Sequence, residues 1–221
     1  MRKILIAVPC MDEVPALFAH SLATLTSYGV EDTQISIRFN LGSLIYTSRD
    51  QLALQAIKDE ADLVMWFDSD MVFPPDTLIR MLKHIDDGQD IVAGVYYRRN
   101  PPFTPTIFKS MELKEDGSAF EWTEYLQVPE EPFKLDACGF GCLLMRTEVF
   151  TAVYTEFGQM FTPLANCGED IAFCWRAKQC GYEILADPTI KLGHVGSTVF
   201  TKEFFETYQF AQKEEKAGRS E

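Results

Sequence analysis

The chain has 221 residues, of which 47% are hydrophobic and 24% are charged, and this composition excludes a largely disordered or fibrous protein. Its 20 basic and 33 acidic residues leave a net charge of −13, which disfavours a partner held mainly through phosphate contacts, such as a nucleic acid. The first apolar run, before Pro9, is too short for a signal peptide or a membrane span. We therefore expect a cytoplasmic protein with no transmembrane segment.

Strands and helices are predicted to alternate through the first half of the chain. Strands are expected at 3–8, 33–39, 61–67 and 89–97, and helices at 14–29, 43–60 and around Leu78–Ile85. Such alternation predicts an α/β fold with a mainly parallel sheet flanked by helices.

The pattern changes after Arg99. The proline-rich stretch 100–108 and the alternating stretch 118–128 predict a small antiparallel portion. The remaining elements are expected as helices at 147–157 and 168–181, a strand at 182–187, a short apolar piece at 190–196 and a terminal helix from about Lys202.

Two aspartates, Asp68 and Asp70, follow the third predicted strand in the stretch MWFDSDMVF. Ligands of open α/β sheets bind beyond the carboxyl ends of the strands, where these aspartates are placed. Two carboxylates so close together repel each other, so we expect a positive partner, and the hard cations Mg²⁺ and Mn²⁺ suit oxygen ligands. The alternative is that these acids merely cap the next helix.

The segment 61–82, ADLVMWFDSDMVFPPDTLIRML, resembles the nucleotide-sugar-binding segment of GT-A fold glycosyltransferases, especially small family 2-like enzymes, some of them carried by phages. Four further segments carry the likeness: IAVPCMDEV, SLIYTSRDQLALQAIKDEAD, KLDACGFGCLLMRTEVF and CGEDIAFCWRAKQCGYEILAD. One departure is Cys10-Met11, which stands where the group usually has Tyr-Asn.

The resemblance implies a single GT-A (Rossmann-like) catalytic domain over 1–221. Residues 1–99 would form the nucleotide-sugar-binding half, 100–200 the acceptor-side half with its antiparallel portion, and 201–221 a C-terminal helix and tail. The implied function is metal-dependent transfer of a sugar from a nucleotide diphosphate sugar to a hydroxyl acceptor, as in hexosyltransferases. The expected cofactor is Mn²⁺ or Mg²⁺, and we take a UDP-sugar as the working donor.

By this resemblance Asp70 would ligate the metal, and Asp68 would hold the ribose or donor sugar, reaching the metal directly or through water. His194, after a short strand and between glycines, would complete the metal shell, although a lone histidine can also be structural. The donor-binding residues implied are Pro9, Glu13, Arg49, Asp68, Ser69, Asp70, Arg98, Gly139 and Gly141.

Two acids, Glu169 and Asp170, open a predicted helix, where acids also offset the helix dipole. In the family pattern the second acid faces the acceptor and is the general base of inverting members. We therefore assign catalysis to Asp170, with Glu169 structural or contacting the acceptor, and favour inversion over retention.

Basic and glycine residues complete the predicted site. Arg49 is expected either to bind a diphosphate through bidentate hydrogen bonds or to hold the D-x-D aspartates in place. Arg98 and Arg99 follow a strand, so at least one is expected to enter the cleft, beside Tyr96 or Tyr97 stacking on a sugar. Glycines in CGFGC indicate a close backbone approach or a positive φ.

Two other functions share these features. A sugar-nucleotide nucleotidyltransferase would share the sheet and the metal, but AVPCMDEVP lacks the Gly-rich loop with a basic residue that such enzymes carry. A noncatalytic module binding a nucleotide sugar or glycan is the other alternative. The sequence leaves the acceptor (glycan, protein or small molecule) and the formation of a homo-oligomer open.

Overall fold

The computed structural model describes residues 1–42 and 44–218, with side chains described up to residue 214. Residue 43, where the second predicted helix was to begin, and residues 219–221 of the predicted tail lie outside the described residues. In the described part, the helices are α1 (Ala16–Tyr28), α2 (Ile45–Lys58), α3 (Thr77–Asp86), α4 (Thr147–Phe157), α5 (Glu169–Gln179) and α6 (Lys202–Gly218).

The central sheet has seven strands in the order β2-β1-β3-β10-β5-β11-β8. Their bounds are β1 (Arg2–Cys10), β2 (Thr33–Leu41), β3 (Leu63–Phe67), β5 (Ile91–Gly94), β8 (Phe133–Leu135), β10 (Cys142–Arg146) and β11 (Ile184–Asp187). Strands β1, β2 and β3 are parallel, as are β5 and β11, and β10 runs antiparallel between β3 and β5. The predicted mixed, mainly parallel sheet is therefore confirmed.

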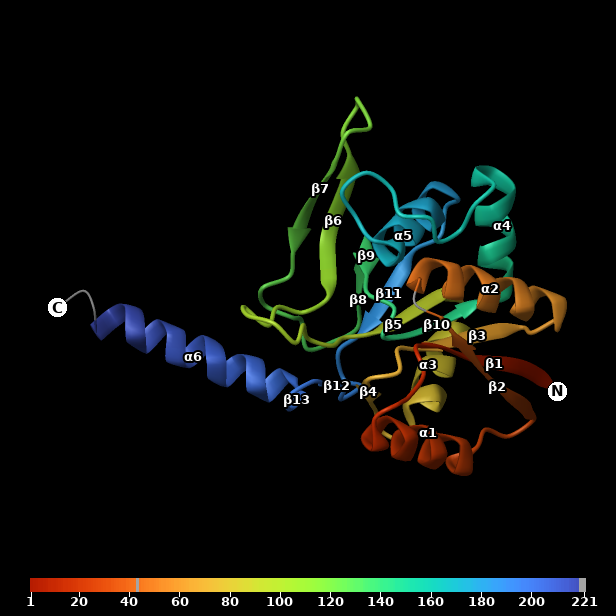
Figure 1. Ribbon diagram of the computed structural model, residues 1–221, viewed down its shortest axis with the longest axis horizontal. Coiled ribbons are helices and arrows are strands. Elements are labelled where there is room, and N and C mark those ends of the chain that lie inside the picture. The colour runs from red at the N-terminus through yellow and green to blue at the C-terminus, as the bar shows by residue number, and fades with distance from the viewer. Residues whose placement is uncertain (43, 219–221) are drawn as a thin grey trace.

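Both faces of this sheet are covered, as Figure 1 shows, with α1 and α3 on one side and α2, α4 and α5 on the other. The alternation of strand side chains explains this arrangement. In β1, Leu5 and Ala7 join the core under α2, α4 and α5, while Ile4 and Ile6 join the core under α1 and α3. Because both faces are buried at β1, β3 and β5, these strands are apolar over their buried length and not alternating, whereas the edge strand β2 is largely exposed.

Two small antiparallel sheets complete the fold. One has the order β7-β6-β9, from β6 (Ile107–Leu113), β7 (Phe120–Glu124) and β9 (Ala137–Cys138), and confirms the predicted antiparallel portion. The other has the order β13-β12-β4, from β4 (Met71–Val72), β12 (Gly193–Val195) and β13 (Val199–Phe200). This second sheet brings the end of the chain back beside the D-x-D segment.

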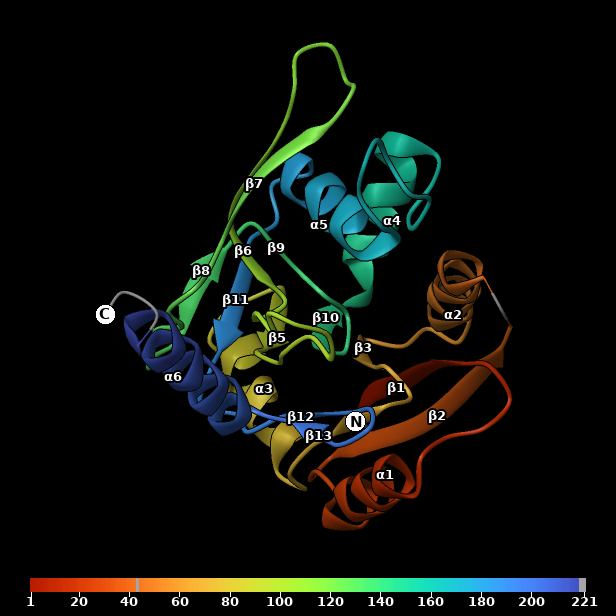
Figure 2. The ribbon, with the colours of Figure 1, turned by 60° about the vertical axis from the view of Figure 1, so that its left-hand side comes forward.

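The C-terminal helix α6 leads away from the rest of the fold (Figures 1 and 2). Its first turns pack through Phe205 against Tyr97, Phe103 and Phe200, in a cluster separate from the two main cores. In the residues that the structure describes, no helix is long and apolar enough to cross a membrane.

Candidate active site

The D-x-D segment forms a tight turn between β3 and β4. The Asp68 backbone N–H donates to the Gly141 carbonyl at 3.2 Å, and the Met71 N–H donates to the Asp68 carbonyl at 3.1 Å. The aspartates thus stand beyond the carboxyl end of β3, where an α/β sheet presents its ligand-binding groups.

His194 lies beside Asp70 because β12 pairs with β4. In this pairing His194 stands opposite Met71, and the Val195 N–H donates to the Asp70 carbonyl at 2.7 Å. The His194 Nε2 lies 3.4 Å from Asp70 Oδ1, and Arg99 Nη1 lies 2.9 Å from Asp70 Oδ2. Burial opposes ionisation of Asp70, but His194 and Arg99 outweigh it and hold the pKa of this carboxyl below its ordinary value.

The other ring nitrogen of His194 fixes its tautomer. Nδ1 lies 2.9 Å from the Tyr97 carbonyl oxygen, which can only accept, so Nδ1 carries a hydrogen. In the neutral ring Nε2 therefore presents its lone pair to Asp70 Oδ1, a buried atom without a hydrogen-bond partner among the described residues. Two acceptors that face each other require a proton or a cation between them.

A hard divalent cation suits this pair of oxygen and nitrogen atoms. The hydrogen bond on Nδ1 is the kind that orients a metal-ligating histidine. The third predicted ligand, Asp68, does not join them here, because its carboxylate is directed to Arg49. Accordingly, the described side chains, of residues 1–42 and 44–214, include no group of three or more His, Cys, Asp or Glu gathered to hold a metal.

Arg49 on α2 links the D-x-D turn to α5. Its side chain is only 3% exposed, with Nη2 2.9 Å from Asp68 Oδ1 and Nε 3.3 Å from Glu169 Oε1. The guanidinium carbon lies 4.9 Å from the centre of the Phe140 ring, a cation–π distance. These contacts match the second predicted role of Arg49, holding the D-x-D segment, and its role in donor binding stays a prediction.

Asp170 stands in the first turn of α5, where its Oδ1 accepts the Ile171 N–H at 2.8 Å. Burial raises the pKa of Asp170 to about 6, with a further rise from Glu169, while Arg49 lowers it. A carboxylate with a pKa near the working pH has the property required of a general base.

The two glycines of CGFGC make room for the Tyr96 ring. A Cβ on Gly139 would lie 2.2 Å from the Tyr96 hydroxyl oxygen, and one on Gly141 would lie 2.6 Å from Tyr96 Cζ. The Gly141 N–H donates to that hydroxyl at 3.1 Å. Close approach, and not a positive φ, therefore explains these glycines.

The prediction that Tyr96 or Tyr97 stacks on a sugar is wrong for this structure, because both are buried, with exposures of 5% and 3%. Tyr96 instead packs edge-on against His194, with the ring centres 5.4 Å apart. Only the long-range return of β12 makes this contact, so the local sequence carried no signal for it.

The two neighbouring arginines separate. Arg98 Nη2 pairs with Glu124 on β7 at 3.0 Å, so the structure does not bring Arg98 to the aspartates. Arg99 pairs with Asp70 and donates to the Val195 carbonyl at 3.2 Å. Sequence reasoning expected one of the two in the cleft but chose Arg98, because nothing local distinguishes them.

The loop after β1 adjoins the D-x-D turn. Pro9 is buried near the end of β1, and the Cys10 thiol donates to the Glu13 carbonyl at 3.2 Å while also contacting the Ser69 side chain. Glu13 itself is exposed. The predicted donor-side residues Pro9, Glu13 and Ser69 therefore lie along one edge of the site.

Comparison with known proteins gives a family match over part of the chain and similar solved structures, two of which are described below. Residues 45–153 match the model of the family described as glycosyl transferase family 2, a range that includes Arg49, the D-x-D segment and both glycines. No curated protein matches the sequence.

Among solved structures, A197 from STIV aligns over 89% of this chain and 86% of its own, with a TM-score of 0.60 and 17% identity. GalNAc-T7, in a crystal structure with UDP, GalNAc and Mn²⁺, aligns over 88% of this chain with a TM-score of 0.58 and 10% identity. This chain spans 43% of the GalNAc-T7 chain. At these identities the two structures establish the fold.

Proposed function

We propose, on the premise that this chain is a family 2-like glycosyltransferase of the GT-A fold, that it uses a divalent cation to transfer a sugar from a nucleoside diphosphate sugar to a hydroxyl acceptor. In this proposal residues 1–221 act as a single catalytic domain. A UDP-sugar and Mn²⁺ are the working donor and cofactor, in line with the ligands of the similar GalNAc-T7 structure.

The observation that carries the proposal is the unpaired, buried Asp70 Oδ1 facing His194 Nε2 at 3.4 Å. These two atoms would hold the cation, and the donor diphosphate and water would supply its remaining ligands, as is usual for Mg²⁺ and Mn²⁺. When bound, the cation would act as a Lewis acid that offsets the negative charge of the leaving diphosphate.

The other residues divide the remaining tasks. Arg99, half exposed beside Asp70, would contact the donor diphosphate and stabilise its charge. Asp68, fixed by Arg49, would orient the ribose or donor sugar, and Ser69 and Glu13 would line the nucleotide side. Arg98 pairs with Glu124 and has no direct donor contact in this scheme.

Asp170 is proposed as the general base that removes the acceptor hydroxyl proton. Its pKa of about 6 leaves it ionised at neutral pH while keeping appreciable basicity. A separate base on the acceptor side favours inversion at the anomeric carbon. Glu169, held by Arg49, would position the first turn of α5.

A thermal-shift panel tests the proposal. Nucleoside diphosphates and their sugars, beginning with UDP, UDP-GalNAc and UDP-glucose, are added with and without Mn²⁺, because a ligand that binds only the folded state raises its melting temperature. At least one should stabilise the wild type only with the metal, and Asp70→Asn should abolish this shift. Asp87→Asn, at an exposed site after α3, is the matched control and should keep it. A shift that needs no metal, or survives in Asp70→Asn, would overturn the assignment, and formation of free UDP from the shifted donor distinguishes an enzyme from a binding module.

A further inference from the structure

A cavity of about 800 Å³ lies apart from the residues that the proposed reaction uses. Its walls come from residues 72–74 in and after β4, the chain after β5, the loop 128–130, the segment 188–193 after β11, and residues 199–206 from β13 into the first turns of α6. Its volume falls in the range of pockets that hold small molecules.

The small sheet β13-β12-β4 separates this cavity from the candidate active site. Strand side chains alternate between faces, and the two faces of this sheet differ accordingly. Val72, Gly193 and Val199 line the cavity, whereas His194 contacts Asp70 on the other face. The cavity therefore lies behind the strand that carries His194 and is distinct from the proposed donor site.

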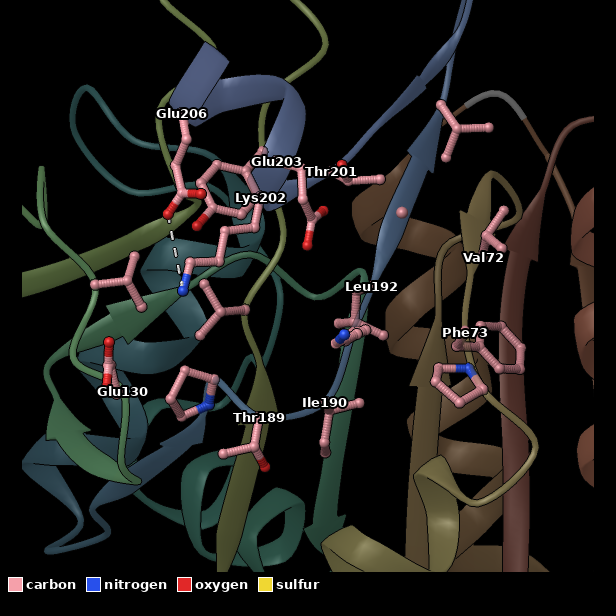
Figure 3. A pocket seen from close by; sticks show the side chains of 18 of the residues that line it. Val72, Phe73, Glu130, Thr189, Ile190, Leu192, Thr201, Lys202, Glu203 and Glu206 are labelled. Carbon is pink, nitrogen blue, oxygen red and sulfur yellow. Dashed lines mark ion pairs between the residues drawn. The ribbon is translucent and has the colours of Figure 1, made fainter. Parts of the chain in front are cut away.

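Most of the wall is apolar. Phe73, Ile190 and Leu192 lie on one side of the cavity, as Figure 3 shows, and α6 covers the opposite side with Lys202, Glu203 and Glu206. A ligand that fills this space would bury an apolar body against the first group and direct a polar end to the second.

The charged part of the lining is acidic. Three carboxylates line the cavity, from Glu130, Glu203 and Glu206, against two ammonium groups, from Lys191 and Lys202. Lys202 lies 3.8 Å from Glu206 in an exposed pair that offsets both charges in part. This leaves Glu130 and Glu203 against Lys191. This balance, in a protein of net charge −13, favours a cationic over an anionic head group.

A phenol also lines the cavity. Tyr97 is only 3% exposed, and its hydroxyl makes no hydrogen bond to the described residues. The same residue holds His194 through its carbonyl. A phenol hydroxyl can accept from an ammonium N–H, which the nearby carboxylates would also attract.

We infer that this cavity is a binding site for a small amphiphilic amine, with an alkyl or aryl body against Phe73, Ile190 and Leu192 and its ammonium group among Tyr97, Glu203 and Glu206. The inference does not depend on the proposed glycosyl transfer.

Three probes of equal chain length test the inference: octylammonium, octan-1-ol and octanoate, titrated by calorimetry or by ligand-observed NMR below their aggregation concentrations. Octylammonium should bind at least tenfold more tightly than octanoate, with octan-1-ol between them. The double variant Glu203→Gln, Glu206→Gln should remove most of this preference. Glu214→Gln, farther along the same helix and exposed, is the matched control and should keep it.

A steric variant locates the site. Val128→Trp, on the loop that closes the cavity, should abolish octylammonium binding, and Val199→Phe provides the same test if the first variant does not fold. Three results would each overturn the inference. They are no octylammonium binding to the wild type, equally tight binding of octanoate, and octylammonium binding that persists in both Val128→Trp and Val199→Phe.

Discussion

Two charged clusters meet at the D-x-D turn, and they differ in what faces their buried polar atoms. Around Arg49, the buried guanidinium faces two carboxylates, Asp68 and Glu169, although its Nε and Nη1 make no hydrogen bond to the described residues. Around Asp70, one carboxylate oxygen pairs with the half-exposed Arg99, while the other is buried beside His194 without a hydrogen bond. In the first cluster opposite charges already face each other and hold α2, the D-x-D turn and α5 together. In the second, Asp70 Oδ1 faces a ring nitrogen that is itself an acceptor in the neutral histidine, and a bound cation would satisfy both atoms.

The Asp70 cluster gives the largest expected effect. Asp70→Asn replaces a charged metal ligand with a neutral amide, so we expect a loss of about 10³-fold or more in kcat/KM, since metal stabilisation is worth several kcal/mol. Stability should fall modestly, because asparagine loses the ion pair with Arg99 that, together with His194, outweighs burial and lowers the pKa of Asp70 in the folded state. Donor-dependent UDP release and a urea melt measure the two quantities. If Asp70→Asn kept its activity but unfolded at a much lower urea concentration, Asp70 would stabilise the fold and would not be a metal ligand.

The next effect concerns Asp170, on the acceptor side. If it is the base, Asp170→Asn should lower kcat by about 10²- to 10⁴-fold. In the wild type, kcat/KM should fall about tenfold per pH unit below the Asp170 pKa of about 6, because the protonated acid cannot accept a proton. If the residual kcat/KM of Asp170→Asn fell in the same way at low pH, the group that titrates would be another residue.

The same substitution makes a separate prediction about stability. Because the folded-state pKa of Asp170 is raised above its ordinary value of 3.8, ionisation costs stability as the pH rises from about 4 through 6. Asparagine removes this cost, so Asp170→Asn should be more stable than the wild type at pH 8, by about 1–3 kcal/mol, and equal to it below pH 4. Urea melts at the two pH values measure the difference. Equal stability at both would show that burial does not strain this carboxylate.

For Arg49 we expect the reverse of the Asp70 result: a substitution should lower the free energy of unfolding at least as much as it lowers kcat/KM. Arg49→Met keeps much of the side-chain volume but leaves Asp68 and Glu169 facing each other unpaired, which we expect to cost about 2–4 kcal/mol. Arg49→Lys should recover only part of this, because an ammonium cannot serve both carboxylates in the same fixed geometry. Denaturant melts test the order. A large activity loss with unchanged stability would move Arg49 to the donor-binding group.

The spacing of apolar residues predicted most of the helices and strands, because apolar residues recur with a different period in each kind of element. The spacing of Leu78, Met81, Leu82 and Ile85 predicted α3, and all four are buried. Strand β10 was not predicted, and neither was its place between β3 and β5, because a short apolar run does not specify its neighbours.

For the site, residue types were easier to predict than partners. The aspartates, His194 and Asp170 were all identified from motifs, and the structure brings His194 to Asp70 at 3.4 Å. The pairing of Arg99 with Asp70 joins segments far apart in the chain, and so does the packing of Tyr96 against His194. Such contacts depend on the β12–β4 pairing, which no short segment encodes.

The smallest expected effect concerns the Tyr96 hydroxyl, which lies between the two clusters. Tyr96→Phe keeps the ring against His194 but leaves the buried Gly141 N–H without its acceptor, so stability should fall by about 1 kcal/mol. Because Asp68 is held to Gly141 through the backbone, a modest loss of kcat should accompany this. Tyr154→Phe, on the exposed face of α4, is the matched control and should change neither quantity. If the two variants melted alike, the Tyr96 hydroxyl would not couple the Gly141 turn to the D-x-D segment, and ring packing alone would explain the two glycines.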